Sequence, residues 1–119
     1  MSDYLGAQYD IPACVRGDTF PGLTITEITV NNEAMSTTLA SVRMDIRTKA
    51  NASTATKALT SAGGDITIDD AAAWGFTIEP FAIDFAARDY VYDIETTDSG
   101  GTVRTYVYGK FRVKQDVTR

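Results

Sequence analysis

The sequence contains no histidine, the commonest general base and the commonest metal ligand in proteins. This absence excludes nucleophilic mechanisms that depend on a histidine base. The single cysteine, Cys14, excludes an internal disulfide framework and any zinc site built from several cysteines. No glycine-rich phosphate loop leads into a helix. We therefore expect a protein that is not an enzyme and has no catalytic, cofactor-binding or metal-binding residues.

Basic residues are also few. The chain has 11 Lys and Arg against 16 Asp and Glu, a net charge of -5. Nucleic-acid binding normally needs a basic patch, so we expect no nucleic-acid partner. No apolar run approaches the roughly 18 residues of a membrane span, and residues 1–6 lack the basic and apolar regions of a signal peptide. We expect synthesis in a cytoplasm and no membrane association.

Leucine and glutamate, both good helix formers, occur only four times each. In contrast, 46 of the 119 residues are Thr, Ile, Val, Tyr, Phe or Trp, which favour strands. The length is that of one domain. This composition disfavours a helical bundle and favours an all-β domain.

Apolar and polar residues alternate in several segments, most clearly in residues 39–47, 90–95 and 103–113. Turn signals separate these segments at intervals of about 8–12 residues, the spacing of antiparallel sandwiches. We predict an antiparallel β-sandwich of about seven to eight strands. The predicted organisation is an N-terminal arm at 1–14, the sandwich at 15–113 and a C-terminal tail at 114–119.

The last predicted strand carries the most informative pattern. Gly109 interrupts its apolar face and predicts a bulge or a close backbone approach. The opposite face is predicted to carry a row of cations and tyrosines: Arg104, Tyr106, Tyr108, Lys110 and Arg112. Tyr and Arg are enriched in interface cores, so this row is a candidate protein interface. The alternative is that the tyrosines pack under a loop with their hydroxyls at the rim.

The C-terminal hairpin also resembles a known family. Residues 89–94 read Asp-Tyr-Val-Tyr-Asp-Ile, and residues 105–113 read Thr-Tyr-Val-Tyr-Gly-Lys-Phe-Arg-Val after a glycine-containing turn. Residues 116–119 read Asp-Val-Thr-Arg, and residues 16–20 read Arg-Gly-Asp-Thr-Phe. This pattern is similar to small virion proteins of tailed bacteriophages and prophages, in particular the N-terminal domain of phage baseplate upper proteins.

The resemblance implies an immunoglobulin-like β-sandwich with a structural role in the virion and no catalytic residues. Its partners would be other virion proteins, and the chain would be a homo-oligomer or present in many copies in a symmetric assembly. Two placements stay open: an assembly or adaptor domain of the tail or baseplate, and a capsid decoration or head-fibre-base protein. The virion would be its final location, after synthesis in the cytoplasm of the bacterial host.

A carbohydrate-binding module is a further alternative, because sandwich domains of that class bind sugars through exposed aromatic residues. Trp74, Tyr106 and Tyr108 are the candidates here. Trp74 alternates with Phe76 and Ile78 on one apolar face, which favours a place in the core.

Overall fold

The computed structural model describes residues 7–30 and 33–115, and within these the chain is all-β with no helix. It therefore contains no helix there that is long and apolar enough to cross a membrane. Thirteen strands are described, more than predicted, because several consist of only two paired residues. They are β1 Ala7–Gln8, β2 Ile11–Val15, β3 Thr19–Phe20, β4 Leu23–Ile25, β5 Thr29–Val30, β6 Glu33–Ala34, β7 Leu39–Arg47, β8 Lys57–Thr60, β9 Ile66–Asp70, β10 Gly75–Ile78, β11 Phe81–Ala82, β12 Arg88–Asp98 and β13 Val103–Lys114.

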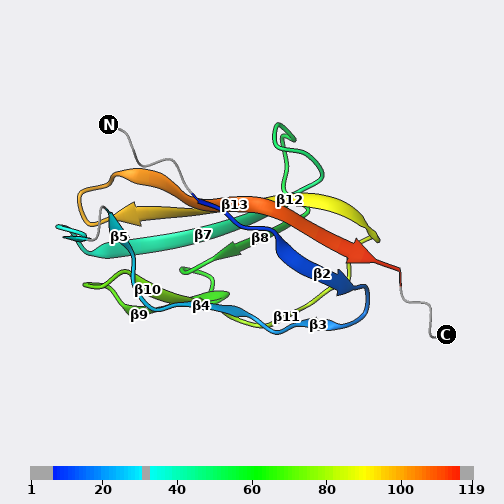
Figure 1. Cartoon of the computed structure of the whole chain (residues 1–119), viewed down its shortest axis with the longest axis horizontal. Helices are drawn as coiled ribbons and strands as arrows, with labels where there is room; N and C mark the ends of the chain where they lie inside the picture. The colour runs from blue at the N-terminus through cyan, green and yellow to red at the C-terminus, as the bar shows by residue number, and fades with distance from the viewer. Residues whose placement is uncertain (1–6, 31–32, 116–119) are drawn as a thin grey trace.

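The long strands form the larger sheet, in the order β1-β13-β12-β7-β8, with β2 also paired to β13. The pairs β13–β12, β12–β7 and β7–β8 are antiparallel. Three smaller sheets, β4-β10-β9, β11-β3 and β5-β6, complete the described structure. In Figure 1 the larger sheet runs along the top of the molecule, and the β4-β10-β9 and β11-β3 sheets run along the bottom. This layered arrangement is consistent with a β-sandwich.

The core lies between the layers and receives alternate residues from each long strand. On β12 these are Tyr90, Tyr92, Ile94 and Thr96, none more than 3% exposed. Four aromatic rings meet at one end of the core. Phe20 lies 5.0 Å from Phe81 and 5.6 Å from Phe111, and Phe85 lies 6.1 Å from Phe111, measured between ring centroids. Apolar burial of this kind is the main stabilising contribution to the fold.

Residues 7–14, the described part of the predicted arm, lie along β13 rather than apart from the domain. β1 and β2 each pair with β13 in parallel, and Ile11 is buried in the core. The main-chain groups on the outer edge of β13 thereby gain hydrogen-bond partners, which explains why this segment joins the sheet. At the other boundary, Lys114 still pairs with Val15, and residues 116–119 of the predicted tail lie outside the described residues.

Gly109 marks the point where the chain crosses from β1 to β2 beside β13. A Cβ at this position would collide with the carbonyl oxygen of Tyr9. That carbonyl accepts a 2.6 Å hydrogen bond from the hydroxyl of Tyr92, and the Asp10 carboxylate accepts one of 3.1 Å from the Lys110 amide. Burial raises the pKa of Tyr92, and nearby Tyr9 and Asp10 contribute in the same direction. The predicted close backbone approach at Gly109 is confirmed.

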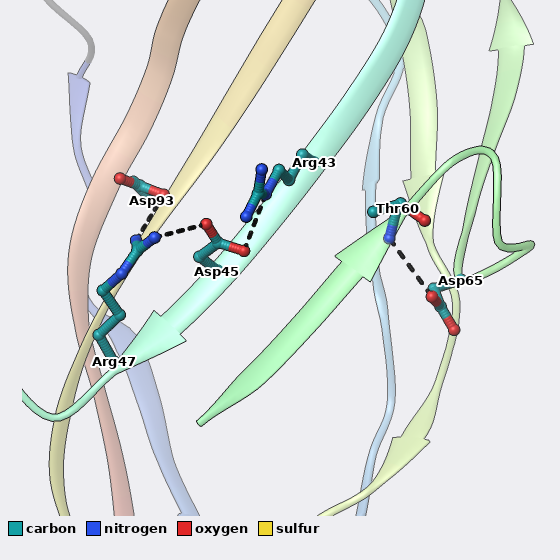
Figure 2. A network of polar contacts seen from close by, with 6 residues as sticks. All are labelled: Arg43, Asp45, Arg47, Thr60, Asp65 and Asp93. Carbon is teal, nitrogen blue, oxygen red and sulfur yellow. Dashed lines mark hydrogen bonds and ion pairs between the residues drawn. The ribbon is translucent and has the colours of Figure 1, made fainter. Parts of the chain in front are cut away.

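Strand β8 lies at the edge of the larger sheet and has only β7 as a partner among the described strands. Its last residue, Thr60, has both main-chain groups bonded to Asp65. The Thr60 amide donates to the Asp65 carboxylate at 3.3 Å (Figure 2). The Thr60 carbonyl accepts from the Asp65 amide at 3.1 Å. This contact shortens the free edge, which is one way that proteins limit pairing with other chains.

Candidate protein-contact face

The outer face of the larger sheet is the side turned away from the core. Residues paired across neighbouring strands share a face, so the register defines it. We use the term outer face for Arg43, Asp45 and Arg47 of β7, Asp89, Val91, Asp93 and Glu95 of β12, and Tyr108, Lys110, Arg112 and Lys114 of β13. The loop of residues 48–56, between β7 and β8, rises above this face in Figure 1.

The structure divides the predicted row of five residues between the two faces of β13. Tyr108, Lys110 and Arg112 lie on the outer face and are exposed. Tyr106 instead turns towards the core, where its ring packs edge-on against Phe76 at 6.2 Å. Arg104 pairs with buried Thr96 and therefore lies on the inner side as well. The prediction that all five share one face is wrong.

A β-bulge causes this division. Ile94 pairs with Val107 and the next residue, Glu95, pairs with Thr105, so Tyr106 is the extra residue on β13. A single extra residue reverses the alternation of every side chain beyond it. The Tyr106 ring is half-buried, which raises the pKa of its hydroxyl.

A network of ion pairs crosses the middle of the outer face (Figure 2). The Arg43 Nε donates to one oxygen of Asp45 at 3.1 Å, and the Arg47 Nη2 donates to the other at 2.8 Å. Arg47 also reaches Asp93 on β12, with 3.9 Å between Nη1 and the carboxylate. Through Arg47, the network of β7 is linked to β12.

Asp45 is only 5% exposed although it points away from the core. Two guanidinium groups lie over it, and each of its carboxylate oxygens accepts a charge-assisted hydrogen bond. Burial of an unpaired carboxylate would be costly, so Asp45 depends on both arginines.

Asp93 lies directly opposite Asp45 in the register of β12 and β7. Burial raises the pKa of the Asp93 carboxyl above its ordinary value of 3.8. Arg47 and Arg43 oppose the increase, while the neighbouring charges of Asp45 and Glu95 add to it. The ionised form of Asp93 is therefore less favourable in the folded protein than in the unfolded chain.

This shift predicts the effect of replacing Asp93 with asparagine. Ionised Asp93 lowers the free energy of unfolding at neutral pH. The penalty disappears as the pH falls through the raised pKa, because the folded state then takes up the proton first. We expect Asp93→Asn to be more stable than the unaltered chain at pH 7, by only about 0.5 kcal/mol because solvent screens this partly exposed group. Urea unfolding at several pH values measures the difference. The stability difference between the variant and the unaltered chain should shrink in acid. A variant that is less stable than the unaltered chain at pH 7 would show that the ion pair with Arg47 outweighs the cost of burying the charge.

A groove of about 450 Å³ lies on the outer face beside this network. Arg47, Ala50 and Asp93 line one part of it, and Tyr108 and Lys110 line another. The Tyr108 side chain is 46% exposed, one of the most exposed large apolar side chains of the described structure. Asp45 lines it as well, so the groove combines an exposed aromatic ring, two cations and two carboxylates.

The pattern Arg43-x-Asp45-x-Arg47 indicates an ion-pair network on one face of a strand, and the predicted interface did not include these residues. Alternate strand residues point to the same face, so this spacing places one cation on each side of a carboxylate. The burial of Asp45 could not be read from this spacing, because it depends on how the arginine side chains fold over it. In residues 7–30 and 33–115, no three or more Cys, Asp or Glu residues gather as a group that could hold a metal.

The aromatic candidates for sugar binding fall in different places. Trp74 is fully buried, and its indole N–H donates to the Thr37 carbonyl at 2.6 Å, so its predicted place in the core is confirmed. Tyr106 packs against Phe76, and only Tyr108 of the three presents an exposed ring. Comparison with known protein families, with curated proteins and with solved structures finds no match for this chain.

Proposed function

We propose that this chain is a non-enzymatic structural protein of a bacteriophage virion, an assembly or adaptor domain of the tail or baseplate with an immunoglobulin-like β-sandwich fold. The outer face is the observation that carries the proposal. Its ion pairs are preorganised, its groove is partly apolar, and Tyr108 stands exposed beside it. Rigid sheet faces with aromatic and arginine side chains suit specific protein contacts.

The resemblance of the C-terminal hairpin to baseplate upper proteins supports the tail placement. The residues that carry this resemblance also have structural roles in this chain. Tyr90 and Tyr92 donate hydrogen bonds to main-chain carbonyls, and Gly109 allows the N-terminal segment to cross β13. The hairpin therefore organises the sheet that presents the outer face.

A place in the phage head, as a decoration protein or the base of a head fibre, is the alternative within the same class. Copy number separates the two placements, because tails use three-fold or six-fold sets whereas shells carry hundreds of copies.

Mass spectrometry of purified virions, produced from the genome that encodes the chain, tests both levels of the proposal. We expect the protein in the particle, in a small multiple of three copies relative to the tail-tube proteins. Hundreds of copies per particle would move it to the head. Its absence from particles that contain all other structural proteins would overturn the virion proposal.

A further inference from the structure

We propose that two copies of this chain pack outer face to outer face around a two-fold axis parallel to the strands, with Tyr108 of each copy seated in the groove of the other. This inference goes beyond the virion proposal, because it concerns the isolated chain and requires no other component.

Two stripes of opposite charge run side by side on the outer face. The β13 stripe carries three cations at alternate positions, Lys110, Arg112 and Lys114. The β12 stripe beside it carries three carboxylates, Asp89, Asp93 and Glu95. Asp89 and Arg112 are register partners, yet their side chains form no ion pair with each other in the described structure. Both charges are exposed and remain available to a second molecule.

The register determines what a two-fold axis would bring together. Neighbouring strands lie about 4.8 Å apart, and an axis between β12 and β13 places β13 of one copy over β12 of the other. Positions along the strands are preserved, so Arg112 of one copy faces Asp89 of the second, and Tyr108 faces Asp93. The same contacts are repeated on the other side of the axis, as an isologous dimer requires.

Other two-fold orientations lack this complementarity. An axis perpendicular to the strands, within the plane between the two faces, would place β13 of one copy over β13 of the other and β12 over β12. Like charges would then face one another. Juxtaposed like charges cost several kcal/mol in an interface and exclude such orientations. In the proposed dimer β7 of one copy lies over the β1–β2 edge of the other. The loop of residues 48–56, which rises above the outer face in Figure 1 and contributes Ala50 to the groove, therefore packs against that edge of the second copy.

The groove explains why Tyr108 is the central contact. Its walls include Val91, Ala50 and the Arg47 guanidinium, which can cover an aromatic ring. The Asp93 carboxylate there has one ion-pair contact, at 3.9 Å to Arg47, and can accept a hydrogen bond from the incoming Tyr108 hydroxyl. Tyrosines that enter a pocket on the partner are frequent hot spots of protein interfaces.

Sedimentation velocity tests the self-association of the full chain from about 10 µM to about 1 mM. We expect a monomer–dimer equilibrium that weakens as salt is added, because the stripe contacts are screened. Tyr108→Ala should weaken the dimer at least about tenfold, as expected for a central hot spot. A chain that stays monomeric at the highest concentration, or a dimer that Tyr108→Ala leaves unchanged, would overturn the proposal.

A charge exchange tests the geometry itself. Asp89→Lys and Arg112→Glu each place like charges opposite one another, and each should weaken self-association at least about tenfold. An equimolar mixture of the two variants restores opposite charges at both contacts and should form a heterodimer as stable as the original dimer. The mixture keeps the test decisive even where one variant is less stable alone.

Asp84→Lys is the matched control, because Asp84 is equally exposed but lies after β11, outside the outer face. It makes the same change of net charge as Asp89→Lys and should leave the dimer unaffected. Equal weakening by Asp84→Lys, or a mixture of the two β12 and β13 variants that stays monomeric, would show that the faces do not meet in this register.

Discussion

Replacing Gly109 with alanine is expected to lower the free energy of unfolding by about 3 kcal/mol or more. The new Cβ would collide with the Tyr9 carbonyl, which is backbone and cannot move aside like the end of a flexible side chain. Displacement of this segment would also break the hydrogen bond from Tyr92 and would leave its buried hydroxyl without a partner. Urea unfolding monitored by far-UV circular dichroism measures the change.

Gly100→Ala provides the control. A Cβ at Gly100 meets only an oxygen of Asp98 at 3.4 Å, an ordinary contact, and Gly100 has no positive φ. Alanine there should leave stability within about 0.5 kcal/mol of the original. Similar stabilities for the two alanine variants would show that the N-terminal segment does not press on Gly109 in solution.

Replacing Trp74 with alanine should cost about 3–5 kcal/mol, the range for removal of a large buried aromatic side chain. The indole is fully buried and donates to the Thr37 carbonyl, so its loss leaves a cavity and an acceptor without its donor. The matched control is Val103→Ala, because Val103 is 57% exposed and should cost little. Thermal and urea unfolding of the three proteins give the comparison.

The backbone at Trp74 makes a sharper prediction. Trp74 has φ of 66°, a left-handed conformation that costs a residue with a Cβ about 1–2 kcal/mol and costs glycine almost nothing. Trp74→Gly should therefore be about 1 kcal/mol more stable than Trp74→Ala, although both remove the indole. An alanine variant as stable as the glycine variant would contradict the left-handed conformation.

The sequence predicted the all-β class and the long strands because alternation is strong where one face of a strand is buried. Residues 39–47 show this well, since Val42, Met44 and Ile46 all enter the core. The close backbone approach at Gly109 could also be predicted, because a glycine inside a strand usually marks a bulge or a point where another backbone segment comes near. Trp74 was placed correctly in the core, but its position in a turn before β10 was not expected.

The bulge at Tyr106 could not be predicted from the sequence, because tyrosine suits either face of a sheet. The segment Tyr106–Tyr108 has an apolar body at every position, so its alternation fits two phases equally well. Only pairing with β12 decides between them. Of the five residues predicted to share one face, Tyr108, Lys110 and Arg112 therefore lie on the outer face. Arg104 and Tyr106 lie on the inner side.

The N-terminal segment was assigned to an arm because its local pattern is weak and includes Pro12. Its pairing partner, β13, lies about a hundred positions further along the chain, beyond the reach of local periodicity. The groove on the outer face could not be predicted for the same reason, because its lining residues come from β1, β7, the loop of residues 48–56, β12 and β13.

The place of β13 in the larger sheet has a consequence for folding order. β13 is the most C-terminal of the described strands, yet it lies between β12 and the N-terminal strands β1 and β2. The first residues of the sheet therefore have no strand to pair with until residues 103–114 have left the ribosome. Closure of such distant contacts is slow compared with local pairing. We expect the nascent chain to expose the Ile11 side chain until β13 emerges, and chaperone binding to this segment to end at that point.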